Sequence, residues 1–139
     1  MRTRDSRAAP NLVEPKSVRV LCAEDDASLA TMLKAALERA GYSVECVDDG
    51  QKALTRIAAD PAFFHVLVTD HHMPQLSGLG LVSKLRDTAF AGAIIVHSSA
   101  LTPSERSAFE ALVVDVILSK PVQLPSLIDA IHRASPARI

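Results

Sequence analysis

Short apolar runs separated by helical patterns organise this chain. Four of the runs are rich in β-branched residues and have the length of strands buried on both faces of a parallel sheet. These runs are Val18–Ala23, His65–Thr69, Ala93–His97 and Val116–Ser119. A fifth strand is predicted at Tyr42–Val47, directly after Gly41, a residue typical of the end of a helix.

Each predicted strand is followed by apolar residues at helical spacing. The clearest case is the last segment, where Leu124, Leu127 and Ile131 recur with a period close to that of an α-helix. Pro103 marks the start of the preceding helix. Strands that alternate with helices in this way predict an α/β fold with a parallel sheet, and right-handed crossovers leave few possible strand orders.

Polar residues stand where four of the predicted strands end. Glu24 and Asp25 follow the first strand, Asp70 follows the third, Ser98 the fourth and Lys120 the fifth. The carboxyl ends of parallel strands share one edge of the sheet, where open α/β sheets bind their ligands. Three carboxylates, a hydroxyl and an ammonium at one edge suit a divalent cation and a phosphoryl group.

Composition narrows the classes of function. A chain of 139 residues with 48% hydrophobic and 22% charged residues predicts one globular domain. The net charge of −1 argues against a broad nucleic-acid-binding surface. No apolar stretch approaches the ~20 residues of a membrane span, and the N-terminus lacks the apolar core of a signal peptide. We therefore expect a cytoplasmic protein that binds neither membrane nor nucleic acid directly.

The ends of the chain differ from its middle. Residues 1–17 contain three arginines and two prolines without periodicity, which predicts a flexible tail or linker, and its arginines are also able to contact an anionic partner. We expect the folded domain to cover residues 18–135 and a short tail to cover residues 136–139. Cys22 and Cys46 lie in predicted strands, so we expect small buried side chains rather than a disulfide or a metal pair.

Five separate pieces of the chain resemble the receiver domain of bacterial two-component response regulators. The resemblance runs from about Val18 to Arg133, and the order and separation of the pieces make it specific. It implies a flavodoxin-like (βα)5 three-layer sandwich with a parallel sheet of order 2-1-3-4-5, an order that a receiver protein illustrates. The pieces are Val20–Asp26, Gly41–Val44 with Asp49–Gly50, Thr69–Pro74 with Gly78, Ile95–Ser98, and Leu118–Pro121.

The resemblance implies a metal site. By position, Asp25 and Asp70 ligate Mg²⁺ (or Mn²⁺), the backbone carbonyl of His72 supplies a third oxygen, and Glu24 acts largely through water. Repulsion between neighbouring carboxylates is expected to raise the pKa of at least one of them when no cation is present. Asp26 matches a variable position and is expected to cap the following helix.

The resemblance also implies a phosphoacceptor. Asp70 would form an acyl phosphate, Lys120 and the metal would neutralise the phosphoryl oxygens, and the Ser98 hydroxyl would donate a hydrogen bond. The Lys120–Pro121 peptide bond is expected to be cis, as is typical of receivers. No kinase or ATP-binding motif lies in the chain, so the donor would be the phosphohistidine of a sensor histidine kinase or a phosphotransfer protein.

Some residues depart from the family pattern. The aromatic switch residue three positions before the lysine is replaced by Ile117, and the usual Gly-Ala pair before the last strand is Val113-Val114. The conventional conformational readout is therefore in doubt. His71, His72 and His97 flank the predicted site, which leaves open a transition-metal site with imidazole ligands, although histidines in loops are often polar surface residues.

These features favour a phosphoaccepting receiver domain, which is not an enzyme except in assisting its own phosphorylation and dephosphorylation. One alternative is a pseudo-receiver that binds other proteins without being phosphorylated. Another is a phosphohydrolase, but its second aspartate is replaced here by His72. By family analogy, the output partner or a homodimer would use the face formed by the helix after Pro103, strand 116–119 and the helix from Leu124. The chain would be a stand-alone regulator or part of a larger protein.

Overall fold

A computed structural model describes residues 17–135. The predicted tails, residues 1–17 and 136–139, lie outside the described residues except for Ser17. The elements alternate strictly between strand and helix. In order they are β1 (Arg19–Ala23), α1 (Ala27–Arg39), β2 (Ser43–Val47), α2 (Gly50–Ala59), β3 (Val66–Thr69), α3 (Gly78–Leu85), β4 (Ala93–Ser98), α4 (Pro103–Ala111), β5 (Val116–Ser119) and α5 (Leu124–Ala134).

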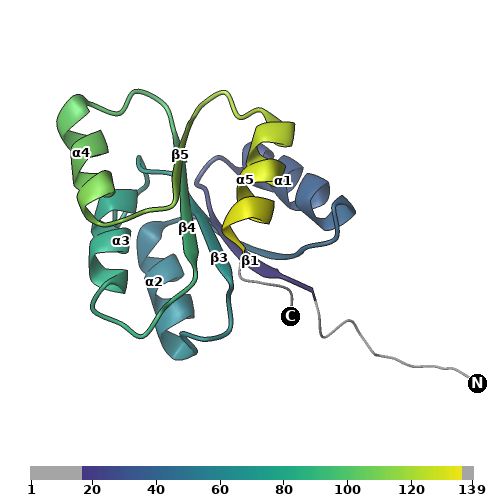
Figure 1. Ribbon diagram of the computed structural model, residues 1–139, viewed down its shortest axis with the longest axis horizontal. Helices are drawn as coiled ribbons and strands as arrows, with labels where there is room; N and C mark the ends of the chain where they lie inside the picture. The colour runs from purple at the N-terminus through teal and green to yellow at the C-terminus, as the bar shows by residue number, and fades with distance from the viewer. Residues whose placement is uncertain (1–16, 136–139) are drawn as a thin grey trace, which may run out of the picture.

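The five strands form one parallel sheet of order β2-β1-β3-β4-β5, which confirms the predicted fold. Helices α1 and α5 cover one face, and α2, α3 and α4 cover the other (Figure 1). The crossover connections place β1 between β2 and β3, with Ala23 opposite Thr69 in the register. The residues that follow β1 and β3 are therefore neighbours at the carboxyl edge of the sheet.

Alternation along the strands divides the core into two layers. On β1, Val20 and Cys22 face α1 and α5, whereas Leu21 and Ala23 face the other three helices. The three central strands are buried on both faces, as the sequence predicts. Strand β5 is only partly buried, contrary to the prediction, because it is an edge strand with a partner on one side alone.

Local side-chain chemistry fixes the helix starts. Asp26, Asp49, Ser77 and Thr102 each accept a hydrogen bond from a backbone N–H in the first turn of the following helix. The expected capping role of Asp26 is thereby confirmed. Helix α1 ends before Gly41, whose φ of 103° suits a residue without a Cβ atom.

The two cysteines occupy register positions opposite each other on β1 and β2. Both are free thiols. Cys22 is buried as expected, but Cys46 is only partly buried because β2 is the other edge strand.

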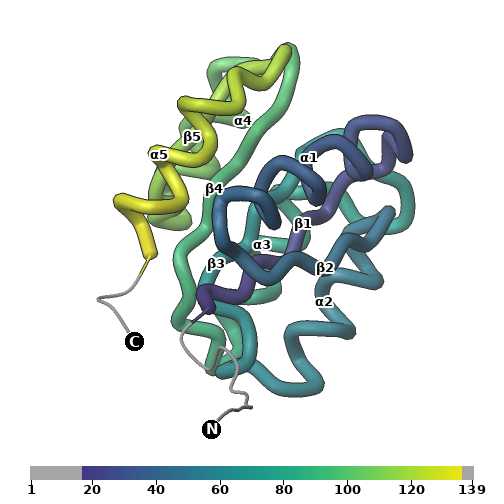
Figure 2. The backbone as a smooth tube through the Cα atoms, turned by 90° about the vertical axis from the view of Figure 1, so that its right-hand side faces the viewer, coloured from purple at the N-terminus to yellow at the C-terminus, as the bar shows by residue number. Residues whose placement is uncertain are grey.

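The two ends of the described chain lie on the same side of the molecule (Figure 2). Ser17 and Ser135 border one small surface pocket beside Gly41. Within residues 17–135, no helix has both the length and the apolar character needed to cross a bilayer.

The turn before β5 holds a strained residue. Val113 has a φ of 61°, in the left-handed region that disfavours β-branched side chains, and its side chain is 73% exposed. A glycine at this position would adopt the same φ without the Cβ clash. The departure from the Gly-Ala pattern noted above therefore has a local energetic cost.

We predict that Val113→Gly stabilises the protein by about 1 kcal/mol, because the steric cost of the left-handed conformation is removed and little buried surface is lost. Urea-induced unfolding measures the change. Val114→Gly is the matched control: Val114 packs against the core cluster beneath α3 and α4, so this substitution should destabilise the protein. A Val113→Gly variant that is less stable than the parent protein would contradict the strain argument.

Candidate phosphoacceptor and metal site

Backbone hydrogen bonds extend the sheet to the acidic residues. The Glu24 N–H donates to Val47 O on β2, and the Asp70 N–H donates to Ala23 O on β1, each over 3.0 Å. The strand alternation therefore continues through Glu24 and Asp70, which lie on the same side of the sheet as Cys22 and α5. This extension fixes both carboxylates at the carboxyl edge of the two central strands.

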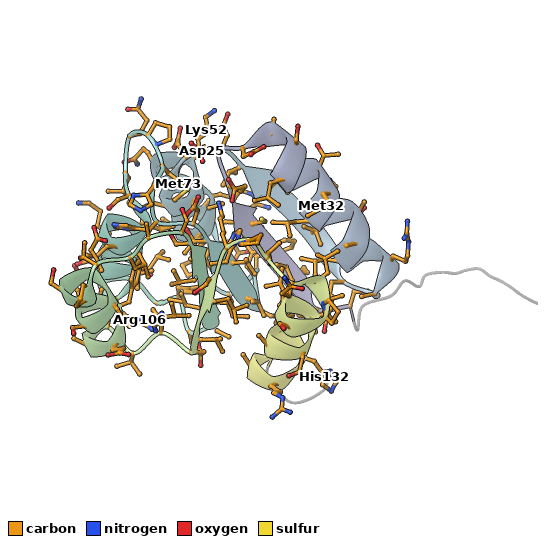
Figure 3. All side chains as sticks on the ribbon, turned by 90° about the horizontal axis from the view of Figure 1, so that it is seen from above. Asp25, Met32, Lys52, Met73, Arg106 and His132 are labelled. Carbon is orange, nitrogen blue, oxygen red and sulfur yellow. The ribbon has the colours of Figure 1, made fainter. Side chains whose placement is uncertain are left out.

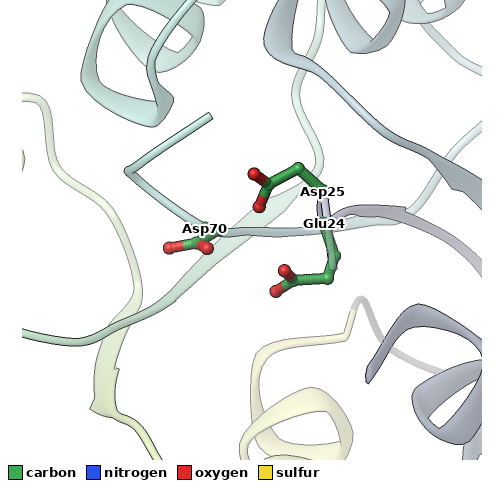
Figure 4. Close-up of side chains that lie close together, drawn as sticks. All are labelled: Glu24, Asp25 and Asp70. Atoms are coloured by element: carbon green, nitrogen blue, oxygen red, sulfur yellow. The ribbon is translucent and has the colours of Figure 1, made fainter. Parts of the chain in front are cut away.

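Three carboxylates converge at this edge. One oxygen from each of Glu24, Asp25 and Asp70 lies within 4.8 Å of the other two (Figure 4). Glu24 and Asp70 are buried, with 1% and 4% exposure, whereas Asp25 is exposed. Asp25 also borders, with Lys52, a cavity of about 420 Å³ beside α1 (Figure 3). The cluster is thus open to solvent on the Asp25 side.

Lys120 lies between the two buried acids. Its Nζ is 2.8 Å from Asp70 Oδ2 and 3.0 Å from Glu24 Oε1. The Lys120 N–H donates to Ser98 O over 3.1 Å, and the Lys120–Pro121 peptide bond is cis. The structure therefore brings together the five residues singled out from the strand ends, with the lysine in direct contact with two of the acids.

The pKa values of the two buried acids move in opposite directions. Burial raises the pKa of Glu24, and hydrogen bonds from the Asp26 N–H and Lys120 only partly offset it. Burial also acts on Asp70, but hydrogen bonds from Lys120 and the His71 N–H outweigh it and lower the pKa of Asp70. The expectation that one carboxylate pKa rises is confirmed. The expected cause, repulsion from Asp70, acts in the same direction but contributes less to the raised pKa than the desolvation of Glu24 does.

Ser98 on β4 lies near Asp70, and Ile117 lies on the neighbouring strand β5. Ser98 is buried, its Oγ donates to Ser99 O over 3.3 Å, and its hydroxyl also contributes to the lowered pKa of Asp70. Ile117 is partly buried and packs into the layer beneath α3 and α4. On β5 it therefore faces away from the sheet side that holds Lys120.

His97 is buried directly beneath the acids. Its Nε2 lies 3.6 Å from Glu24 Oε1, and neither ring nitrogen makes a hydrogen bond. Burial and the nearby Lys120 charge lower the pKa of His97 to about 4, so the imidazole is neutral at neutral pH. Alternation along β4 places His97 on the same face as the buried Ile95, a signal in the sequence that indicates a buried imidazole.

The histidines do not form a metal site among the described residues. The group close enough to hold an ion there consists of the three carboxylates. His71 is buried rather than a surface residue, because its ring packs against Phe109 and hydrogen-bonds Leu79 N–H and Glu105. The expectation of polar surface histidines in the loop is therefore wrong for His71.

A sequence model of the response regulator receiver domain matches residues 20–132. The chain belongs to the response regulator receiver domain family. This receiver domain is 38% identical over 112 residues to the response regulator MprA of Mycobacterium tuberculosis, and the match covers 81% of the chain and 48% of MprA. It is 30% identical over 120 residues to the sensory/regulatory protein RpfC of Xanthomonas campestris, and the match covers 84% of the chain and 16% of RpfC. The chain thus spans half or less of the length of these relatives.

Solved structures show the same receiver fold. The receiver domain protein of Methanospirillum hungatei superposes with a TM-score of 0.80 at 23% identity, and 84% of this chain and 92% of that chain are covered. The chemotaxis response regulator CheY4 of Vibrio cholerae superposes with a TM-score of 0.76 at 28% identity, with 85% and 98% covered.

The raised pKa of Glu24 predicts a pH-dependent stability. The folded state holds the Glu24 proton more tightly than the unfolded state, so stability falls as pH rises above the unfolded value of about 4.3. Glu24→Gln removes this loss and should stabilise the metal-free receiver domain by about 0.5–2 kcal/mol at about pH 7. Near pH 4 the gain should shrink towards zero. Urea unfolding in the presence of a chelator measures both values, and a gain that does not change with pH would contradict the desolvation argument.

Proposed function

We propose that this receiver domain accepts a phosphoryl group on Asp70 from the phosphohistidine of a sensor histidine kinase or a phosphotransfer protein. The carrying observation is the position of the Asp70 carboxylate, which is 4% exposed, belongs to the acidic cluster and contacts the Lys120 ammonium. Its lowered pKa keeps it ionised at neutral pH and so able to act as a nucleophile.

The reaction is a transfer between two proteins. A carboxylate oxygen of Asp70 attacks phosphorus, the bond from phosphorus to the donor imidazole nitrogen breaks, and the imidazole leaves with that electron pair. Lys120 already lies 2.8 Å from Asp70, so its ammonium needs only a small shift to neutralise a phosphoryl oxygen. The Ser98 hydroxyl then donates to another phosphoryl oxygen in place of Ser99 O. Histidine kinases form the donor phosphohistidine with ATP. We therefore place the reaction in the cytoplasm.

The acid cluster fits a hard divalent cation. Three carboxylates within reach of one another, one of them exposed, form an oxygen donor set of the kind that Mg²⁺ or Mn²⁺ prefers. In this proposal Asp25 and Asp70 ligate the ion, the carbonyl of His72 adds a third oxygen, and Glu24 binds through water. When bound, the ion supplies positive charge at the phosphoryl oxygens and relieves the repulsion among the acids.

In this proposal the chain has a signalling role and assists only its own phosphorylation and dephosphorylation. The output partner, or a second copy of the chain, would bind the surface formed by the edge strand β5 and by α4 and α5, which lie on opposite faces of the sheet (Figure 1). The relatives carry the names sensory/regulatory protein and response regulator, which suits a phosphorelay. A covalent negative charge at Asp70 would bias this surface between two states.

We predict that incubation with Mg²⁺ and phosphoramidate adds one phosphoryl group, seen as an increase in intact mass. Asp70→Asn should reduce this adduct at least tenfold, roughly 1.4 kcal/mol in barrier, because the amide is a poor nucleophile. Asp26→Asn is the control, since asparagine preserves the helix cap to Leu29 N–H.

Three outcomes of this experiment separate the alternatives. An adduct that requires Asp70 supports the proposal. The absence of any adduct in the parent chain, with either phosphoramidate or acetyl phosphate as donor, would favour a pseudo-receiver. Small phosphate esters are offered in a parallel incubation, and multiple turnover of these esters would indicate a phosphohydrolase.

We predict that Asp25→Asn weakens Mg²⁺ binding at least tenfold, about 1.4 kcal/mol, because a charged oxygen ligand is lost. Asp26→Asn removes the same charge from the adjacent exposed residue, but its carboxylate caps α1, so binding should change less than about threefold. Isothermal titration calorimetry measures both. Equal losses in the two variants would indicate a general charge effect rather than a ligand.

A further inference from the structure

His71 connects the proposed phosphoacceptor to α4. Its backbone N–H donates to Asp70 Oδ1 over 2.6 Å, and its carbonyl accepts from the Gly78 N–H over 2.8 Å. Its ring is buried against the edge of Phe109, with ring centroids 5.4 Å apart at 84°. One residue thus contacts the acceptor carboxylate through its backbone and α4 through its side chain.

The hydrogen bonds of the ring define its tautomer. Nδ1 lies 3.2 Å from the Leu79 N–H, which can only donate, so Nδ1 must be the unprotonated acceptor. The ring proton of the neutral imidazole is then on Nε2, which lies 3.2 Å from Glu105 Oε2. His71 therefore accepts a hydrogen bond from the first turn of α3 and donates one to α4.

Glu105 completes the connection. Its Oε1 accepts from the Thr102 N–H over 2.9 Å, and its own N–H donates to Thr102 Oγ1 over 3.1 Å, which is a capping box at the start of α4. Its second carboxylate oxygen is the partner of His71. The same carboxylate therefore caps α4 and holds the loop that carries Asp70.

We propose that the His71 imidazole is a positioning residue that fixes the acceptor loop and couples Asp70 to the first turn of α4. The coupling to phosphorylation rests on the proposed function; the connection itself does not. A change at Asp70 Oδ1 acts on the backbone N–H of His71, and the ring passes that displacement to Glu105 and the cap. Ile117 has no polar group or aromatic ring for this role, whereas His71 contacts α4 at both Glu105 and Phe109.

Two substitutions with amide side chains test the roles of the two ring nitrogens separately. The side-chain oxygen of asparagine falls near the position of Nδ1, so His71→Asn keeps an acceptor for Leu79 N–H and loses the bond to Glu105. The side-chain nitrogen of glutamine falls near Nε2, so His71→Gln keeps a donor to Glu105. We expect the Gln variant, and not the Asn variant, to retain the coupling.

The first measurement uses the unmodified protein with a chelator. Nitrogen NMR of the His71 ring should show a protonated Nε2 and an unprotonated Nδ1. Hydrogen exchange at amides 104–106 should be at least threefold faster in His71→Asn than in the parent, and near the parent rate in His71→Gln. In a Glu105→Ala background His71→Asn should add nothing further, whereas in the control background Glu110→Ala, an exposed residue of the same helix, its effect should persist.

The second measurement adds Mg²⁺ and beryllofluoride, a mimic of the phosphoryl group. In the parent, exchange at amides 104–106 should change at least threefold, and in His71→Asn this response should fall below about 1.5-fold. A protonated Nδ1, or equal exchange in the Asn and Gln variants, would overturn the connection. A retained response in His71→Asn would overturn the coupling. If the parent gives neither a beryllofluoride complex nor a phosphoryl adduct, the proposed function fails, while the connection is still decided by the first measurement.

Discussion

The contact of one ammonium with two buried carboxylates is the constraint on which the rest of the site depends. Glu24 and Asp70 lie almost out of solvent at adjacent strand ends, and removal of two anions from water is unfavourable unless a cation accompanies them. The Lys120 ammonium is that cation, with its Nζ 3.0 Å from Glu24 Oε1 and 2.8 Å from Asp70 Oδ2. Asp25 remains exposed and free of that contact. The site therefore holds one internal positive charge and leaves the Asp25 carboxylate facing solvent.

The fold supplies this geometry through its sheet. Because β1 lies between β2 and β3, the residue after β1 and the residue after β3 become neighbours, and their backbone N–H groups continue the hydrogen bonding of the sheet to Val47 and Ala23. Lys120 follows β5, an edge strand three positions from β1 in the sheet, and its long side chain spans the distance to Asp70 and Glu24. The helices contribute less directly, since their caps fix where each loop ends.

Much of this arrangement could be predicted from the sequence, for physical reasons that also set the limits. Strand and helix periods depend on local spacing, so each strand lies within one residue of its expected bounds and α4 begins at Pro103 as expected. The strand order and the roles of Asp70 and Lys120 came from a resemblance rather than from spacing. The partial burial of β5 and the burial of His71 could not be predicted in the same way, because they depend on which elements pack together in three dimensions. The left-handed conformation of Val113 opposes its side-chain preference, so local propensity gave no sign of it.

The shared location of the chain ends has an architectural consequence. Ser17 and Ser135 border one pocket at the amino edge of the sheet, whereas Asp70 lies at the carboxyl edge. Any polypeptide joined at Ser17 or Ser135 would therefore leave the domain at the edge of the sheet opposite Asp70. Such a unit can be inserted into a longer protein as a self-contained module, with its two connections side by side.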